Sequence, residues 1–281
     1  MRLKIFNFLI HSVGLIFGLK LIVKNHNGEN VLTYNSKKYS LIPVPDFKGK
    51  IYNSDNLTTT NNHKFINDSN FIRSKNVAES RWPNANKRDI SWRLNTVLWA
   101  FGHSLQANHV DSINIECGTG LGYMASAIAE YYDLNENPKN FYLIDTFSKE
   151  LIDPDGSKSE SPAEFAYIND SQGFNEVRNY FKKYQSIHLI KGLIPNILEE
   201  LPNKKISFIH MDLNNANAEI AALEYLKNKF ISGTIILFDD YGGYGGDEQA
   251  EACDLFATKY KQKLLNIPTG QALIIWNNHA E

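Results

Sequence analysis

From residue 88 to the end of the chain, short apolar runs alternate with segments in which apolar residues recur at helical spacing. The apolar runs show no polar alternation, which is typical of strands buried on both faces of a parallel sheet. Helices between such strands cover both faces. The pattern therefore predicts an α/β domain with a doubly wound, mostly parallel sheet. We expect strands at 112–117, 141–145, 187–191, 206–212, 234–239 and 272–276; helices at 88–107, 121–132 and near 248–260; one helix with Phe174, Val177, Phe181 and Tyr184 on one side; and one that buries Ile220, Leu223, Leu226 and Phe230.

The composition excludes several classes of protein. A net charge of −2 and the lack of an arginine-rich run argue against a nucleic-acid partner. The two cysteines, Cys117 and Cys253, have neither zinc-type spacing nor the density of a disulfide framework. We expect small buried thiols in a reducing cytoplasm.

The N-terminal residues 1–24 are strongly apolar between Lys4 and Lys20. A membrane-spanning helix needs about 20 apolar residues, and Lys20 interrupts the run too early. A signal peptide is the other alternative, but no small-residue cleavage site follows. We expect an amphipathic helix that lies on the inner face of a membrane or packs against another subunit of a homo-oligomer.

Residues 25–87 are rich in Asn, Ser, Thr and Lys and contain only short apolar pieces. This composition predicts a loop-rich lead-in or a small β element. The globular domain is then expected at 88–281.

A glycine-rich turn follows the first expected strand, with Glu116 at the strand end and glycines at 118, 120 and 122. Glycine allows a sharp turn and close approach of a ligand, because it has no Cβ. A dinucleotide-binding turn reads G-x-G-x-x-G and would need glycine at Tyr123. Asp/Glu-x-Gly-x-Gly-x-Gly instead resembles the first motif of class I S-adenosylmethionine-dependent methyltransferases. A plain loop without a cofactor is the alternative.

Asp145 ends the second expected strand. In nucleotide-binding α/β folds, an acid at this place accepts hydrogen bonds from the ribose hydroxyls, since a carboxylate offers two acceptor oxygens. The alternative is an N-cap for the segment that starts at Thr146. We favour ribose binding.

Three more carboxylates, those of Asp212, Asp239 and Asp240, lie at the ends of expected strands. Carboxyl ends of parallel strands meet at one sheet edge, where each pair of carboxylates repels by about 4 kcal/mol at about 4 Å and an effective dielectric constant of about 20. A Mg²⁺ ion would remove this repulsion, and Asn214 could add an oxygen if the strand geometry continues that far. The alternative is a strand that ends in solvent.

His210 shares a strand face with Asp212 and is a candidate general base or holder of a ligand water. A hydrogen-bonded core histidine is the alternative. Glu219, on the next helix, either supports the carboxylates or interacts with the helix dipole. The stretch from Asp239 to Asp247 contains four glycines and two tyrosines, which suits either a lid over a sugar-like ring or a loop with no ligand.

With these residues in place, the chain resembles the macrocin-type sugar O-methyltransferases over roughly residues 110–276. The resemblance rests on the motifs Glu116-Cys-Gly-Thr-Gly-Leu-Gly122, Asp145-Thr-Phe147, Lys191-Gly192 with Pro195, Ile209-His-Met-Asp-Leu-Asn214, Ser232-Gly233, Leu237-Phe-Asp-Asp-Tyr241 and Pro268-Thr-Gly-Gln271. It implies a seven-stranded, Rossmann-like class I methyltransferase domain. It also implies a metal site at Asp212, Asp239 and Asp240, and methylation of a sugar hydroxyl.

Two departures from the family pattern concern the acceptor side. Members with a well-defined sugar substrate tend to carry Asp-x-Asp-x-Tyr where this chain has Asp212-Leu-Asn-Asn-Ala216. The loop at about 148–172 contains no histidine that could serve as a base.

The sequence thus predicts an S-adenosylmethionine-dependent, Mg²⁺-dependent O-methyltransferase that acts on a sugar or glycan hydroxyl. The cofactor would contact a set of residues from two strand ends: Glu116, Gly118, Thr119, Gly120, Gly122, Asp145 and Thr146. His210 and Asp239 are the candidate catalytic residues. An NAD-dependent enzyme on a similar sheet and an inactive adaptor with the same fold remain as alternatives.

Overall fold

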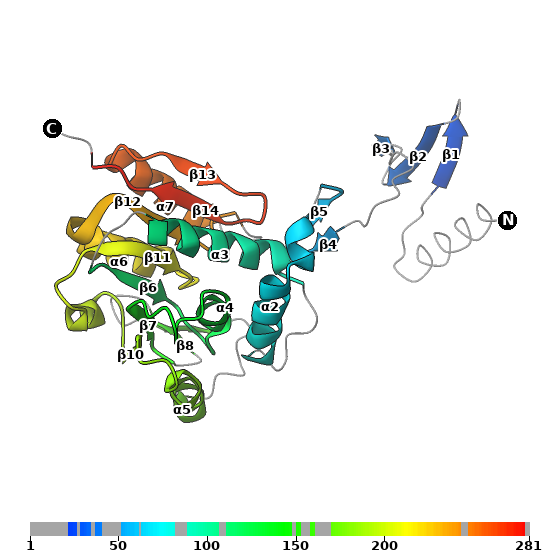
Figure 1. Cartoon of the computed structure of the whole chain (residues 1–281). Coiled ribbons are helices and arrows are strands. Elements are labelled where there is room, and N and C mark those ends of the chain that lie inside the picture. The colour runs from blue at the N-terminus through cyan, green and yellow to red at the C-terminus, as the bar shows by residue number, and fades with distance from the viewer. Residues whose placement is uncertain are drawn as a thin grey trace. The chain divides into compact units, whose positions relative to one another are not determined.

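The structure is a computed structural model of the chain (Figure 1). It describes residues 22–26, 29–34, 37–40, 52–61, 63–81, 89–106, 111–147, 150–152, 158–160, 170–242 and 247–278. The chain divides into two compact units, Met1–Ile51 and Tyr52–Glu281.

The first unit contains a small antiparallel sheet of three strands: β1 (Ile22–His26), β2 (Glu29–Tyr34) and β3 (Lys37–Ser40). A small β element was one of the two interpretations of residues 25–87. The predicted helix at 1–24 lies mostly outside the described residues, which begin at Ile22. Residues 22–24, the last three of that range, belong to β1 and not to a helix. In the described part of the chain, no helix combines the length and apolarity that crossing a bilayer requires.

The second unit is built on a seven-stranded sheet with the order β10-β7-β6-β11-β12-β14-β13. All neighbours pair in parallel except that β14 runs antiparallel to both β12 and β13. This arrangement confirms the predicted fold class. The strands are β6 (Ile113–Cys117), β7 (Phe141–Asp145), β10 (Ile187–Lys191), β11 (Ile206–Met211), β12 (Phe230–Phe238), β13 (Leu264–Asn266) and β14 (Ala272–Ile275).

Two hydrophobic cores lie on opposite faces of this sheet. The first packs one face against α2 (Ser69–Arg81), α3 (Ser91–Gln106), α4 (Tyr123–Tyr131) and α5 (Asp170–Phe181). The second packs the other face against η3 (Asn196–Glu200), α6 (Ala216–Leu226) and α7 (Asp247–Lys259). Figure 1 shows α3 running across the sheet, and its Phe101 ring lies 5.5 Å from that of Phe141 and 5.4 Å from that of Phe208. Burial of a side chain of this size contributes about 1.5–3 kcal/mol, so α3 is held firmly on the sheet.

Smaller elements connect these layers. A two-stranded hairpin, β4 (Tyr52–Ser54) and β5 (Leu57–Thr59), opens the unit, and a second pair, β8 (Glu150–Ile152) and β9 (Lys158–Glu160), follows β7. Two single turns of 3-10 helix are η1 (Lys64–Asn67) and η4 (Lys227–Lys229).

The structure corrects three details of the predicted elements. Phe230 is the first residue of β12 and not part of the preceding helix, which ends at Leu226. The edge strand β13 was not predicted, and three residues are too few for a clear pattern. Helix α2 lies in the range read as loop-rich, because its few apolar residues, such as Phe71 and Ala78, are enough to pack it against α4.

Candidate active site

The glycine turn lies between β6 and α4, and all three of its glycines have positive φ: 91° at Gly118, 53° at Gly120 and 83° at Gly122. A Cβ on Gly118 would lie 1.8 Å from the backbone oxygen of Asp212. A Cβ on Gly120 would meet nothing within 4 Å. Gly118 therefore permits contact between two strand ends, while Gly120 faces open space that a ligand can occupy.

Backbone hydrogen bonds bring four strand ends to the same level. The N–H of Gly118 donates to Ile144 O at 2.8 Å, that of Asp212 to Cys117 O at 2.8 Å, and that of Asp239 to Met211 O at 2.9 Å. The glycine turn and the acids that follow β7, β11 and β12 are thereby placed along one edge of the sheet. Ligands of open α/β sheets bind at this edge, beside the point where the strand order reverses, here between β6 and β11.

Asp145 holds the glycine turn. Its Oδ2 accepts the N–H of Gly120 at 2.8 Å, and its Oδ1 accepts the N–H of Phe147 at 2.6 Å. The second bond is a local cap of the segment after β7, so it agrees in part with the capping alternative. Burial raises the pKa of Asp145, and the two N–H donors partly offset this effect. Asp145 thus shapes the turn, and ribose binding stays a prediction.

A line of buried polar groups runs from Glu116 through His210 to Asp239. His210 Nδ1 lies 3.1 Å from Glu116 Oε1, and its Nε2 lies 3.4 Å from Asp239 Oδ1. Burial alone would lower the pKa of His210, but its bonds to Asp239 and Glu116 raise it well above the ordinary value. Both ring nitrogens of His210 therefore face carboxylates, and the contact with Asp239 helps to hold that carboxylate in place. This arrangement argues against the predicted role of His210 as general base.

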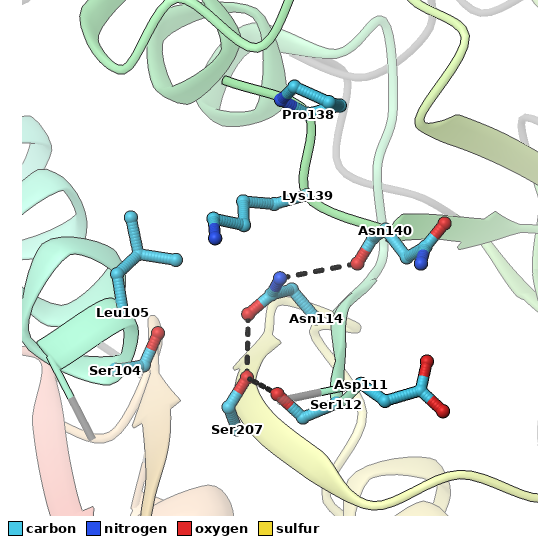
Figure 2. A pocket seen from close by; sticks show the side chains of 9 residues that line it. All are labelled: Ser104, Leu105, Asp111, Ser112, Asn114, Pro138, Lys139, Asn140 and Ser207. Atoms are coloured by element: carbon cyan, nitrogen blue, oxygen red, sulfur yellow. Dashed lines mark hydrogen bonds between the residues drawn. The ribbon is translucent and has the colours of Figure 1, made fainter. Parts of the chain in front are cut away.

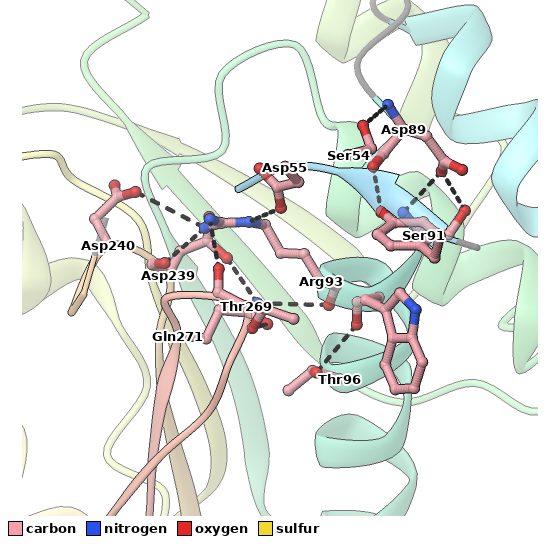
Figure 3. A network of polar contacts seen from close by, with 12 residues as sticks. Ser54, Asp55, Asp89, Ser91, Arg93, Thr96, Asp239, Asp240, Thr269 and Gln271 are labelled. Atoms are coloured by element: carbon pink, nitrogen blue, oxygen red, sulfur yellow. Dashed lines mark hydrogen bonds and ion pairs between the residues drawn. The ribbon is translucent and has the colours of Figure 1, made fainter. Parts of the chain in front are cut away.

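Asp239 is also bound by Arg93, from the first turn of α3 (Figure 3). Arg93 Nη1 donates to Asp239 Oδ2 and to its backbone oxygen, both at 2.6 Å. Gln271 Nε2 donates to Asp239 Oδ1 at 2.8 Å. Burial would raise the pKa of Asp239, but the charge of Arg93 and the bonds from His210 and Gln271 hold it well below the ordinary range. Asp239 is therefore ionised and tightly oriented.

The predicted metal ligands do converge in part. Ligand atoms of His210, Asp212 and Asp239 lie within 4.8 Å of one another. Asp240 Oδ1 lies 3.8 Å from Arg93 Nη1. Burial, and then the charges of Asp239 and Asp240, raise the pKa of Asp212 well above its usual value, which is the repulsion expected of carboxylates that share a site.

Asn214 does not continue the strand geometry after Asp212. Strand β11 ends at Met211, and Asn214 has a φ of 53°. The strand therefore does not continue to residue 214, as it would have to for Asn214 to point to the same side as Asp212. Its neighbour Asn215 caps α6 by accepting the N–H of Ala218 at 2.9 Å.

Two buried polar atoms beside the glycine turn have no hydrogen-bond partner within the described part of the chain: Glu116 Oε2 and Thr119 Oγ1. The two residues are 1% and 5% exposed. Buried polar groups in proteins are nearly always paired, so these two atoms are available to hydrogen-bond a ligand. In the sequence, the two residues flank Gly118, and Thr119 directly precedes Gly120.

The other predicted features have structural roles as far as they are described. Glu219 is buried on α6, and burial followed by the charge of Asp240 raises its pKa to about 8. Tyr241 Oη donates to Asp254 of α7 at 2.9 Å. Residues 243–246 of the glycine-rich loop, including Tyr244, lie outside the described residues, so the lid interpretation stays a prediction. Gly122 ends the turn as the N-cap of α4, and Thr146 follows Asp145 with its side chain half-buried.

A separate cavity of about 350 Å³ lies at the opposite edge of the sheet, beside the amino ends of β6, β7 and β11 (Figure 2). Its polar lining is bonded within itself: Ser207 Oγ lies 3.0 Å from Asn114 Oδ1, and Asn114 Nδ2 donates to Asn140 O at 3.2 Å. These bonds occupy polar groups of Ser207, Asn114 and Asn140, and Lys139 also lines the cavity.

Comparisons with known proteins agree with this placement. Residues 115–241 match the model of a family described as a methyltransferase domain. This range, a little under half of the chain, is the part that is similar to methyltransferases. The matched range begins in β6 and ends just after Asp240, so it contains the glycine turn and all three acids of the proposed metal site.

Several solved methyltransferases share the fold. The O-methyltransferase NovP covers 66% of this chain and 80% of its own length, with 17% identity and a TM-score of 0.50. The alignment with the calicheamicin methyltransferase CalS11 covers 75% of this chain and 94% of that protein, with 15% identity and a TM-score of 0.53. The Podospora anserina methyltransferase PaMTH1 was solved with S-adenosylhomocysteine. Its alignment covers 75% of this chain and 89% of that protein, with 16% identity and a TM-score of 0.52. No curated protein sequence matches the chain significantly.

The second unit contains two functional candidates that the sequence analysis missed, Arg93 and its partner Asp55, both of which precede the matched range 115–241. Arg93 lies on the buried face of its helix, between Ile90 and Val97, and a charge on an apolar face is a usable signal. Asp55 lies in the turn of a hairpin far away in sequence, and no local pattern connects it to the acids. Gln271 appeared only as part of a family motif.

Proposed function

We propose that the chain is an S-adenosylmethionine-dependent O-methyltransferase that acts on a hydroxyl of a sugar or glycan-type acceptor. The observation that carries this proposal is the contact of Gly118 with Asp212, which brings a cofactor-type turn directly beside an acidic edge. A methyl donor at the turn and a hydroxyl at the acids would then lie next to each other, as direct transfer requires.

The residues present fit the cofactor. Gly120 leaves space above the turn, and the unpaired Glu116 Oε2 and Thr119 Oγ1 provide an acceptor and a hydroxyl for its polar groups. Asp145 keeps the Gly120 N–H in place and retains lone pairs for ribose hydroxyls. We assign Gly118, Gly122 and Thr146 to the shape of the pocket.

The acidic edge fits a divalent cation, with Asp212, Asp239 and Asp240 as the residues that would hold Mg²⁺. Crowding of Asp212 and Asp239 and the raised pKa of Asp212 support this assignment. His210 is excluded as a ligand because both of its ring nitrogens face carboxylates. Mg²⁺, when bound, supplies Lewis acidity that lowers the pKa of an acceptor hydroxyl.

The chain's own residues would contribute orientation. His210, Gln271 and Arg93 fix the Asp239 carboxylate before any substrate arrives, so its position does not have to be established during the reaction. In the transfer, the hydroxyl oxygen forms a bond to the methyl carbon, the bond between that carbon and sulfur breaks, and the hydroxyl proton passes to solvent water. We therefore regard Asp239 as an orienting residue and His210 as its support.

The acceptor and the location are the least constrained parts of the proposal. The resemblance to macrocin-type enzymes supports a sugar hydroxyl. The apolar N-terminal residues 1–24 support contact with the cytoplasmic face of a membrane, where lipid-linked glycans are found. Flotation of the full chain with anionic lipid vesicles, compared with a chain lacking residues 1–24, tests this contact, and equal flotation of both would contradict it.

The central experiment is calorimetric titration with S-adenosylhomocysteine, using Thr119→Val and Thr119→Ser as a matched pair. Thr119 Oγ1 has no hydrogen-bond partner among the described residues, so the valine variant should fold as well as the wild type. If the hydroxyl binds the cofactor, Thr119→Val weakens binding about tenfold while Thr119→Ser retains it.

Activity is then measured as transfer of a labelled methyl group to a panel of nucleotide sugars and glycans, with and without Mg²⁺. Tight binding of a nicotinamide cofactor and none of S-adenosylhomocysteine would favour the NAD-dependent alternative. Cofactor binding without transfer to any acceptor would favour an inactive adaptor.

A further inference from the structure

Arg93 is a buried cation at the acidic edge, and every one of its nitrogens has an oxygen partner. Nε donates to Asp55 Oδ2 at 3.1 Å, Nη1 to Asp239, and Nη2 to the backbone oxygen of Thr269 at 3.1 Å. The side chains of Arg93, Asp55 and Asp239 are 8%, 3% and 8% exposed. A buried ion pair of this kind is stable only when hydrogen bonds satisfy it on all sides.

Arg93 places a positive charge beside the same carboxylates that a divalent cation would bind. Its Nη1 contacts Asp239 Oδ2 at 2.6 Å and approaches Asp240 Oδ1 at 3.8 Å, and these are two of the three acids of the proposed metal site. Asp239 Oδ1 already faces Gln271 and His210. A cation that binds Asp239 must therefore share Oδ2 with Arg93 and tolerate a like charge nearby.

Asp55 reaches this edge from a different part of the chain. It lies in the two-residue turn between β4 and β5, where Asp55 and Asn56 have φ values of 54° and 58°. Such left-handed pairs form tight hairpin turns. The hairpin is further joined to the start of α3, because Tyr52 Oη donates to Asp89 O and the Asp89 N–H donates to Ser54 Oγ at 2.9 Å. Figure 3 shows Asp55 and Asp239 on opposite sides of the guanidinium.

We propose that Arg93 is the resident cation of the acidic edge, that it competes with a divalent ion for Asp239, and that Asp55 moderates this competition by holding Arg93 from the other side. Arg93 and Asp55 are positioning residues. Through Asp55, the β4–β5 hairpin contributes a negative charge that partly offsets the charge of Arg93. The inference rests on the proposed function for the identity of the competing ion.

Substitutions of Arg93 and Asp55 should change the affinity for Mg²⁺ in opposite directions. Removal of the positive charge in Arg93→Gln takes away a like charge and frees Asp239 Oδ2, so Mg²⁺ should bind on the order of tenfold more tightly. Removal of the negative charge in Asp55→Asn leaves Arg93 less compensated, so Mg²⁺ should bind more weakly by several-fold. General damage to the site would weaken binding in both variants.

The test is calorimetric titration of the full chain with MgCl₂ in the absence of cofactor. Wild type, Arg93→Gln, Arg93→Lys and Asp55→Asn are compared with Arg73→Gln, which removes an exposed arginine paired with Glu130. Arg73→Gln and Arg93→Lys should stay close to the wild type. Thermal unfolding monitors folding, and asparagine suits the left-handed φ of residue 55, so Asp55→Asn still carries the test if Arg93→Gln does not fold.

Equal or weaker Mg²⁺ binding by a folded Arg93→Gln variant, or tighter binding by Asp55→Asn, would overturn the inference. Separate titration with S-adenosylhomocysteine keeps the two proposals apart. If only Arg93→Gln binds Mg²⁺, the inference is supported while the metal dependence of the wild-type enzyme is refuted. If no variant binds Mg²⁺ but the cofactor binds, the inference fails and the methyltransferase proposal does not.

Discussion

Two glycines of one turn have different physical roles, although the sequence treats them alike. Gly118 has no room for a Cβ, which would lie 1.8 Å from the Asp212 oxygen, whereas a Cβ on Gly120 would meet nothing within 4 Å. Gly118 is therefore required for the close packing of two strand ends, while Gly120 borders the pocket that we propose for the cofactor.

Substitution by alanine should separate these roles. Gly118→Ala should lower the free energy of unfolding by about 3 kcal/mol or more, because backbone must move. Gly120→Ala should cost only about 1–2 kcal/mol for its left-handed φ, but its Cβ should reduce affinity for S-adenosylhomocysteine. Urea unfolding and calorimetry measure both quantities. Equal stability losses in the two variants would contradict the assignment.

Glu219 provides a prediction on pH. Burial, and then Asp240, raise its pKa from 4.5 to about 8. Between these values the unfolded chain has ionised Glu219 while the folded chain keeps the proton, so the contribution of this group to stability falls as pH rises and is lost above about 8. Glu219→Gln lacks this titration.

We therefore expect Glu219→Gln to gain stability relative to the wild type as pH rises from 5 to 8.5, on the order of a few kcal/mol. Urea unfolding at both pH values, in buffer with a chelator of divalent ions, measures the difference. The chelator matters because a bound cation would stabilise the carboxylate. A stability difference that does not change with pH would refute the prediction.

At the scale of elements, α6 begins immediately after the loop that carries Asp212. Its N-cap is Asn215, whose side chain accepts the N–H of Ala218 at 2.9 Å. The cap ends the loop in a defined place and thus helps to orient the backbone between Asp212 and the helix. Loss of such a cap typically costs about 1 kcal/mol.

Asn215→Ala should accordingly lower the free energy of unfolding by about 1 kcal/mol, and Asn215→Asp should restore most of it, because aspartate is also a good cap. Urea unfolding of both variants checks this. If aspartate is as damaging as alanine, the side-chain cap is not what stabilises the helix start.

For the whole molecule, the structural boundary at Tyr52 differs from the predicted start of the domain at residue 88. The compact unit includes the β4–β5 hairpin, whose Asp55 binds Arg93, and α2, which buries Phe71 and Ala78 against α4. Both lie before residue 88. A fragment that begins at 88 would expose the apolar faces that α2 covers.

We expect residues 52–281 to unfold cooperatively and to bind S-adenosylhomocysteine like the full chain. A fragment of residues 88–281 should melt roughly 10 °C lower or aggregate, since loss of a few kcal/mol shifts the melting temperature by this amount in a domain of this size. Circular dichroism of the two purified fragments tests the boundary. Equal melting temperatures would restore the boundary at 88.

The sheet and the acids at its edge were predictable from the sequence, because both depend on local patterns. Strands buried on both faces must be apolar throughout, and the strands 141–145 and 187–191 have the predicted bounds. The glycine turn and Asp145 follow their strands directly. Parallel strands then bring such residues to one edge, whatever the rest of the chain does.

Only the tertiary structure decided which partners these acids have. Arg93 comes from α3, His210 from β11 and Gln271 from the residue before β14, and they bind Asp239 through contacts between residues up to 146 positions apart. Such partners leave no periodic or motif signal, because their selection depends on distances and burial that arise when helices pack on the sheet. The sequence by itself therefore determined the fold and the strand ends at which the candidate acids lie, because these depend on local patterns, and packing determined the charge balance around the acids.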